Sequence, residues 1–132
     1  MNMHSEMVLS QTDHRPMYLQ IMEQIRHRVA LGDWPPGQEL PSIRVMAAAL
    51  NVSVITVKRA YLELEHEGVI VTRQGKGSFI ADTPEIGESL RVQEVDQHLQ
   101  AAITTARLTG MTDAELQDRL LSLLNRHKES NP

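Results

Sequence analysis

The stretch "SVITVKR", from Ser53 to Arg59, combines hydroxyl and cationic side chains at the start of a candidate helix. We expect Ser53 to be the N-cap, because serine accepts hydrogen bonds from the first free backbone N–H groups of a helix. The hydroxyls of Ser53 and Thr56, together with those N–H groups, suit a phosphate oxygen. Lys58 and Arg59 are long enough to reach further phosphates, and an arginine can also bind a guanine edge. The stretch therefore predicts noncovalent binding of nucleic acid.

Val54 and Ile55 occupy the first turn of the same helix, where polar side chains would be expected for this role. Helical spacing assigns the buried face to other residues, Val57, Ala60, Tyr61 and Leu64. Val54 and Ile55 are therefore predicted to face outward. An apolar side chain in the major groove can read sequence by packing on the methyl group of thymine. The alternative is that both residues pack under the β-hairpin that follows.

A second helix precedes this one and would form a helix-turn-helix with it. Pro41 and Ser42 start it, with the Ser42 hydroxyl as cap, and it ends near Asn51, a residue that tolerates the left-handed conformation of a tight turn. The short connection to Ser53 is typical of the helix-turn-helix motif. Arg44, at the start of the second helix, opposes the helix dipole, so a DNA contact explains it better than simple solvation does.

Elements on either side complete a winged helix-turn-helix domain over residues 15–82. A helix beginning at Pro16 and stopping at Gly32 has one apolar face, made of Tyr18, Ile21, Met22, Ile25 and Val29. After Gly68 the hydrophobic period changes to two, which predicts a β-hairpin, the wing. Its basic tip is a candidate DNA contact, with an ordinary solvated turn as the alternative. The tip comprises Arg73, Gln74, Gly75, Lys76 and Gly77.

Residues 83–132 are predicted to form two amphipathic helices after a join marked by Pro84 and Gly87. Thr112 and Glu115 have the spacing of a capping box at the start of the second helix. Two such helices cannot bury a sizeable core alone, so we expect them to pair with a second copy in a two-fold dimer. The alternative is that they pack back on their own DNA-binding domain. The predicted dimerisation residues are Val92, Val95, Leu99, Ile103, Leu116, Leu120, Leu123 and Leu124.

The charge distribution favours DNA although the net charge of the 132-residue chain is −4. Segments 40–62 and 68–81 contain no Asp or Glu, whereas the residues beyond Pro84 carry five Lys or Arg against eight Asp or Glu, a net charge of −3. An acid-free strip of this kind suits phosphate. The absence of cysteine and of any apolar run approaching ~18 residues favours a cytoplasmic protein that does not span a membrane. Residues 1–14 are predicted to be a flexible N-terminus.

No enzymatic or cofactor site is visible in the sequence. We find no nucleophile with a matching base, no phosphate-binding P-loop and no paired carboxylates in an apolar setting. The six histidines form no metal-binding cluster. The rival to DNA binding is a winged helix that contacts protein, which the negative net charge permits. The acid-free strip and the basic wing argue against it, since such a module has no need to keep acids away from those surfaces.

Residues 17–81 resemble the GntR family of bacterial transcription regulators, through "PPGQELPS", "TVKRAY", "LEHEG" and "GKGSF". The two-helix tail is similar to the dimerisation tail of the YtrA subfamily, whose members often control transporter genes. The resemblance implies a repressor that binds a two-fold symmetric operator as a homodimer. It leaves open whether a small-molecule effector releases the protein from DNA.

The resemblance also implies which residues contact DNA: Arg44, Ser53 to Thr56, Lys58, Arg59, Gln74, Gly75 and Lys76. The chain departs from the family pattern at two of its positions. Val54 stands where the family often has a base-reading arginine, and Ile43 where an acidic residue often follows the capping serine. We therefore expect the operator bases to differ from those that an arginine would select.

Overall fold

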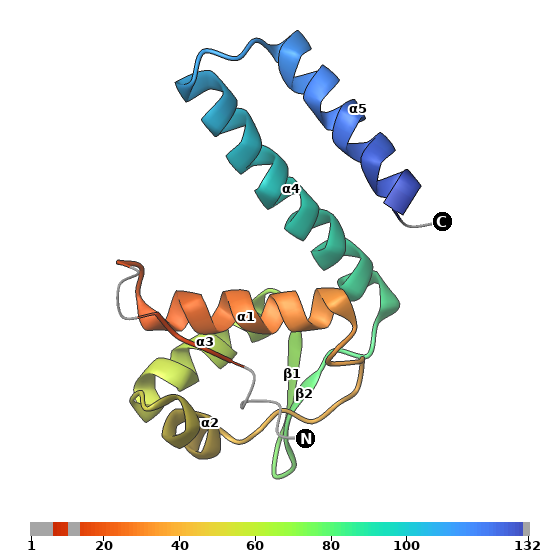
Figure 1. Cartoon of the computed structure of the whole chain (residues 1–132). Coiled ribbons are helices and arrows are strands. Elements are labelled where there is room, and N and C mark those ends of the chain that lie inside the picture. Colours follow the sequence, from red (N-terminus) through yellow and green to blue (C-terminus); the bar gives the residue numbers. More distant parts are fainter. Residues whose placement is uncertain (1–6, 11–13, 131–132) are drawn as a thin grey trace. The chain divides into compact units, whose positions relative to one another are not determined.

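The computed structural model describes residues 7–10 and 14–130 (Figure 1). Its elements are α1 (Met17–Leu31), α2 (Ile43–Leu50), α3 (Val54–His66), β1 (Ile70–Arg73), β2 (Gly77–Ile80), α4 (Pro84–Leu108) and α5 (Asp113–Ser130). This order confirms the predicted fold class, a mainly α winged helix-turn-helix with a small β-wing followed by two C-terminal helices. The chain divides within α4 into two compact units, one up to Glu94 and the other from Val95 onward.

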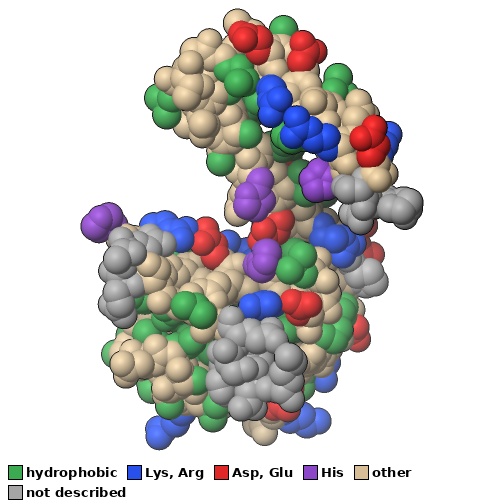
Figure 2. Space-filling view, in the orientation of Figure 1, with side chains coloured by type: hydrophobic (Ala, Val, Ile, Leu, Met, Phe, Trp, Pro, Cys, Tyr) green, Lys and Arg blue, Asp and Glu red, His purple; other side chains and the backbone are tan. Residues whose placement is uncertain are grey.

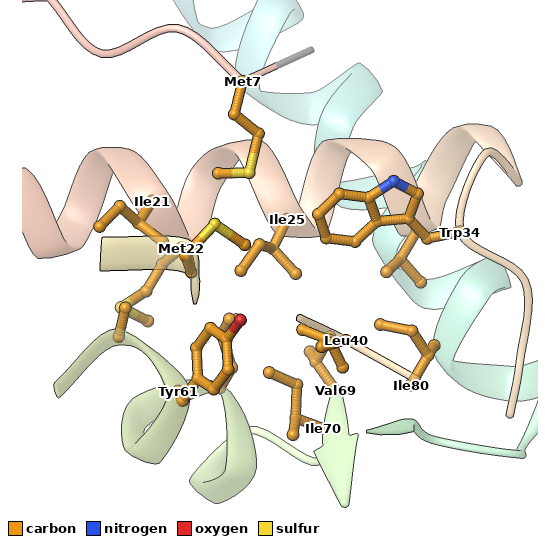
Figure 3. Packing of buried hydrophobic residues seen from close by; sticks show 14 of the residues in the cluster. Met7, Ile21, Met22, Ile25, Trp34, Leu40, Tyr61, Val69, Ile70 and Ile80 are labelled. Carbon is orange, nitrogen blue, oxygen red and sulfur yellow. The ribbon is translucent and has the colours of Figure 1, made fainter. Parts of the chain in front are cut away.

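The hydrophobic core of the first unit lies between α1, α3 and the wing (Figure 3). Ile21 and Ile25 of α1 are fully buried and face α3 and β1. Pro16 precedes the first helical residue of α1 rather than being that residue, and Gly32 ends the helix with a φ of 81°. The predicted buried face of α3 is confirmed for all four of its residues, Val57, Ala60, Tyr61 and Leu64.

The helix-turn-helix has the caps that the sequence predicts. The Ser42 hydroxyl accepts a hydrogen bond from the Val45 N–H at 3.2 Å at the start of α2. Asn51 ends α2 with φ 56° and ψ 48°, in the left-handed region that asparagine tolerates better than most side chains. The chain therefore turns sharply enough for Ser53 to cap α3 after a connection of three residues, 51–53.

The wing is a hairpin in which β1 pairs antiparallel with β2, from Ile70 opposite Ile80 to Arg73 opposite Gly77. A further extended segment, which the sequence did not predict, runs along the free edge of β2. The Leu40 N–H donates to the Ser78 carbonyl and the Ile80 N–H donates to the Gln38 carbonyl, each at 2.8 Å. The loop before α2 thus satisfies the outer backbone groups of β2 and fixes the wing to the domain.

A short N-terminal segment is held against α1 by two glutamine side chains. The side-chain amide of Gln24 bonds to both the N–H and the carbonyl of Val8, and that of Gln20 does the same for Ser10, at 2.9 and 3.3 Å. Met7 is buried in the core. Residues 7–10 therefore differ from the flexible N-terminus expected over 1–14, of which residues 1–6 and 11–13 lie outside the described part.

The first C-terminal helix begins earlier than the sequence predicted, whereas the second begins with the predicted capping box. α4 starts at Pro84 and continues through Gly87, so the predicted join is the first turn of a helix. The capping box of α5 is confirmed: the Thr112 N–H donates to Glu115 Oε1 and the Glu115 N–H donates to Thr112 Oγ1, both at 3.1 Å. Among the described helices, none is both long and apolar enough to cross a membrane.

Candidate nucleic-acid interface

The first turn of α3 is capped and exposed. The Ser53 hydroxyl accepts a hydrogen bond from the Thr56 N–H at 3.1 Å and lies 2.8 Å from the Thr56 hydroxyl. Val54 is 46% exposed and Ile55 is 79% exposed. Burial of both side chains under the wing is therefore contradicted, and their predicted outward position is confirmed.

The cations of α2, α3 and the wing form no ion pair with a carboxylate in the part of the chain that the structure describes. On α1, by contrast, Arg26 binds both carboxylate oxygens of Glu67, at 2.9 and 3.3 Å. A cation without a carboxylate partner can bind a phosphate without first giving up an ion pair. The cations without a carboxylate partner are Arg44, Lys58, Arg59, Arg73 and Lys76, and all five are exposed.

Two of these arginines are held in place by aromatic rings. The guanidinium carbon of Arg59 lies 3.9 Å from the ring centroid of Tyr18, on α1. That of Arg73 lies 4.9 Å from the ring centroid of Phe79, across the wing. Such cation–π contacts restrict a long side chain while leaving its N–H groups free to bind other acceptors. Both arginines are therefore partly ordered before any partner binds.

The start of α2 is tied to α3 by a buried hydroxyl. Tyr61 of α3 donates a hydrogen bond to the Pro41 carbonyl at 2.8 Å, and burial raises the pKa of the Tyr61 hydroxyl well above its usual value. The hydroxyl thus stays protonated and remains a donor. Because Pro41 immediately precedes Ser42 and is three residues before Arg44, this bond helps to set the position of the α2 candidates relative to those of α3.

The wing tip is a tight turn in which the Lys76 N–H donates to the Arg73 carbonyl at 2.9 Å. Gly75 has a φ of 76° and Gly77 a φ of 122°, and L side chains rarely adopt either value. Glu39 lies beside the wing, with Oε1 3.1 Å from the place where a Cβ on residue 77 would stand. The acid-free segment 68–81 therefore has the Glu39 carboxylate next to it in space.

Figure 1 shows α2 and the wing tip at the end of the first unit away from α1. Along that edge Figure 2 shows Lys or Arg side chains at two places, with hydrophobic side chains between them and an acidic side chain beside one of them. The predicted DNA-binding residues come from three places: Ser42 and Arg44 from the cap and first turn of α2; Ser53 to Thr56, Lys58 and Arg59 from the cap and start of α3; and Arg73 to Gly77 from the wing. In the described part of the chain no group of three His, Asp or Glu side chains could hold a metal ion.

The predicted dimerisation residues lie along α4 and α5 with their apolar side chains largely in solvent. Val92 and Val95 are each 57% exposed, and Leu124 is 50% exposed. Leu99, Leu120 and Leu123 are likewise exposed, while Ile103 and Leu116 are half-buried. The sequence did not single out two further exposed leucines on these helices, Leu108 and Leu121. A run of exposed apolar side chains of this length is typical of an interface.

Sequence reasoning missed the residues that position the site. Tyr18 was assigned to the apolar face of α1 and Tyr61 to that of α3, which is correct, but their contacts with Arg59 and Pro41 were not foreseen. The contact of Phe79 with Arg73 and the position of Glu39 beside Gly77 were not foreseen either. Residues 20 or more positions apart supply the Tyr18 and Tyr61 contacts, so no local pattern reports them.

Comparison with known families matches residues 17–80 to the family described as "Bacterial regulatory proteins, gntR family". The chain is 36% identical over 102 residues to the Bacillus subtilis "Uncharacterized HTH-type transcriptional regulator YhcF", covering 77% of this chain and 84% of YhcF. It is 40% identical over 67 residues to the Bacillus subtilis "HTH-type transcriptional repressor YtrA", covering 51% of this chain and 52% of YtrA. These relatives are named as transcriptional regulators, which confirms the prediction that the chain is not an enzyme.

Solved structures agree with this assignment. A "GntR family transcriptional regulator from Listeria monocytogenes" is similar over 86% of this chain and 96% of its own, with a TM-score of 0.75 and 26% identity. The DNA-binding domain of AraR, solved "in complex with operator ORE1", is similar over 55% of this chain and 89% of its own, with a TM-score of 0.50 and 29% identity. The first similarity extends past the winged helix into the C-terminal helices.

Proposed function

The chain belongs to the gntR family of bacterial regulatory proteins, within its YtrA subfamily, and from this premise we propose that it represses transcription by binding a two-fold symmetric DNA operator as a homodimer. That it is a DNA-binding transcription regulator follows from family membership. Repression, the symmetric operator and the dimer are the proposal. The observation that carries operator binding is the set of cations without carboxylate partners around the exposed first turn of α3, and the dimer rests on the exposed apolar side chains of α4 and α5.

The first turn of α3 would enter the major groove, as the recognition helix of a helix-turn-helix does. Ser53, Thr56 and Lys58 would bind phosphates, and Arg59 a phosphate or a guanine edge. Ser42 and Arg44 would contact the backbone from the start of α2. The wing tip, from Arg73 to Gly77, would follow the neighbouring backbone or minor groove. Val54 and Ile55 face the groove floor in this arrangement.

The homodimer is supported by the exposed apolar side chains on α4 and α5, which leave a surface that water solvates poorly. A two-fold axis through these helices would present two recognition helices to half-sites ~34–36 Å apart, or a multiple of that distance. The negative charge of the tail keeps this surface away from DNA. The same proposal includes the DNA-binding residues, the dimerisation residues and a functional boundary between residues 82 and 83.

Repression is supported by the printed name of YtrA, a transcriptional repressor, to which the chain is 40% identical in the matched region. Control of transporter genes and release by a small-molecule effector rest on the subfamily resemblance alone. A cytoplasmic location follows from the proposed access to DNA.

The test is selection of bound sites from a random duplex library by the full chain at two salt concentrations. We expect enrichment of a two-fold symmetric site, with weaker binding at higher salt because bound cations release counterions from DNA. A reporter gene with this site at its promoter should then be expressed less when the protein is present. Failure to enrich any site at either salt would contradict the proposal and favour the protein-binding winged helix.

The oligomeric state is tested by sedimentation of the wild type and of Leu99→Lys with Leu123→Lys. We expect the wild type to sediment as a dimer and the double variant as a monomer with weaker operator binding. Leu31→Lys is the matched control, because Leu31 is 61% exposed but lies on α1. An unchanged mass in the double variant would contradict the proposed interface.

A further inference from the structure

We infer that the protein selects its operator by the C5 methyl groups of thymine, which pack against Val54 and Ile55 in each half-site. This inference deepens the proposed function and rests on it. It names the base that the first turn of α3 reads, at a position where a cationic or polar side chain would read guanine or adenine.

The geometry of α3 leaves most of the Ile55 side chain and nearly half of the Val54 side chain in solvent. The buried residues Val57, Ala60 and Leu64 fill one face of the helix. Ile55 stands on the opposite face, since 100° per residue separates it by about half a turn from the centre of the buried face. Its side chain is 79% exposed, and that of Val54 is 46% exposed. The exposed apolar surface of this pair contributes no burial to the free protein.

The charges around Val54 and Ile55 indicate which kind of partner contacts them. Lys58 is one turn from Val54, and Arg59 one turn from Ile55, and neither has a carboxylate partner among the described residues. The capped N-terminus of α3, with the Ser53 and Thr56 hydroxyls, adds further groups that favour phosphate. An apolar protein surface would have to bury these cations, whereas a DNA groove places phosphates at both edges and bases at its floor. The surface therefore suits DNA with an apolar group at the floor of the groove.

Thymine is the base that presents such a group. In the major groove it offers a C5 methyl beside the O4 acceptor, whereas guanine, adenine and cytosine offer only donors and acceptors. Valine and isoleucine cannot satisfy those polar groups, so placing them over another base would strip water from it without compensation. Arg59 can still bind a phosphate or a guanine edge beside the pair while it stacks on Tyr18, 3.9 Å from the ring centroid, but its guanidinium does not supply the apolar contact that a thymine methyl needs.

The experiment uses the full chain and the symmetric site recovered by selection, synthesised with thymine or with deoxyuridine at each position in turn. Deoxyuridine lacks only the methyl group and keeps the hydrogen-bonding pattern. For the wild type we expect one or two positions per half-site where this replacement weakens binding roughly three- to five-fold, the value of burying one methyl group. Val54→Ala with Ile55→Ala should bind the thymine and deoxyuridine sites with nearly equal affinity.

Two variants separate methyl recognition from other effects. Leu62→Ala removes an exposed side chain two turns further along the same face, 45% exposed, and should keep the wild-type response to deoxyuridine. Lys58→Ala should weaken both sites by the same factor and reduce the salt dependence. Equal losses on deoxyuridine replacement in the wild type and the double alanine variant, or no loss in either, would overturn the inference. The proposed function would survive that result, whereas failure to recover any site would contradict both.

Discussion

The guanidinium of Arg59 and the ring of Tyr18 are stacked, with 3.9 Å between the guanidinium carbon and the ring centroid. The contact joins the recognition helix to the start of α1 and holds a long side chain in one orientation. We expect Tyr18→Leu to weaken operator binding about two- to five-fold, in line with ~0.5–1 kcal/mol for an exposed cation–π contact. The affinity for the selected operator is the measurement.

Tyr18→Phe is the control for this contact, because it keeps the ring and should keep the affinity. The double variant Tyr18→Leu with Arg59→Ala should bind no more weakly than Arg59→Ala alone. An equal loss in Tyr18→Leu and Tyr18→Phe would mean that the stacking does not contribute to DNA binding.

The Tyr61 hydroxyl should contribute to stability through the Pro41 carbonyl, which it bonds at 2.8 Å. Tyr61→Phe leaves a part-buried carbonyl without its donor, so we expect the free energy of unfolding to fall by about 1–2 kcal/mol. Chemical denaturation followed by circular dichroism measures it. Tyr18→Phe, which removes a hydroxyl from a half-buried ring, should change stability little; an equal loss in the two variants would refute the role of the Pro41 bond.

Glu39 should weaken DNA binding, because its carboxylate lies next to the wing at Gly77. We expect Glu39→Gln to raise operator affinity by up to roughly five-fold at low salt, within the 0.2–1 kcal/mol typical of exposed charge pairs. The gain should shrink as salt is added, since exposed charges are screened. Glu85→Gln, an exposed acid at the start of α4, is the control. A salt-independent gain would point to a change in wing geometry instead of charge.

The capping box of α5 predicts a pH dependence. Hydrogen bonds from the backbone and side chain of Thr112 lower the pKa of Glu115. A carboxyl group whose pKa is lower in the folded than in the unfolded state stabilises the fold above its unfolded pKa, about 4.3, and that stabilisation is lost as the pH falls through the lowered folded value. Melting followed by circular dichroism from neutral to acidic pH should show this loss. Glu115→Gln keeps an acceptor for the Thr112 N–H, so its melting should depend less on pH over the same interval; an unchanged dependence would exclude Glu115 as the source.

The helix-turn-helix could be predicted from the sequence because its determinants are local. Ser42 and Ser53 cap helices within three residues of themselves, and Asn51 adopts the left-handed conformation at the turn it occupies. The buried face of α3 follows from a spacing of three and four, which fixes a direction around the helix. The outward position of Val54 and Ile55 followed from the same geometry, so the part of the site on α3 was accessible from sequence.

The contacts that support the site were not accessible, since they join segments far apart in the chain. Gln38 and Leu40 pair with β2 across about 40 residues, and their short segment has too few alternating positions to be recognised as a strand. The stacking of Arg59 on Tyr18 and the bond from Tyr61 to Pro41 likewise depend on how helices pack. Composition also did not indicate the contacts of residues 7–10, where the side-chain amides of Gln20 and Gln24 bond the backbone of Ser10 and Val8.

The segment before α1 is part of the folded DNA-binding domain, although it lies outside the region that matches the family. The family match starts at residue 17, yet Met7 fills a place in the core above α1, and the side-chain amide of the buried Gln20 is satisfied by the backbone of Ser10 (Figure 3). A domain excised at Met17 would contain every predicted DNA contact, but it would expose to water the apolar surface that Met7 covers and would lose the bonds between Gln20 and Ser10. The burial of a methionine side chain alone is worth about 1.5–3 kcal/mol. The boundary that homology suggests and the boundary that folding requires are thus ten residues apart.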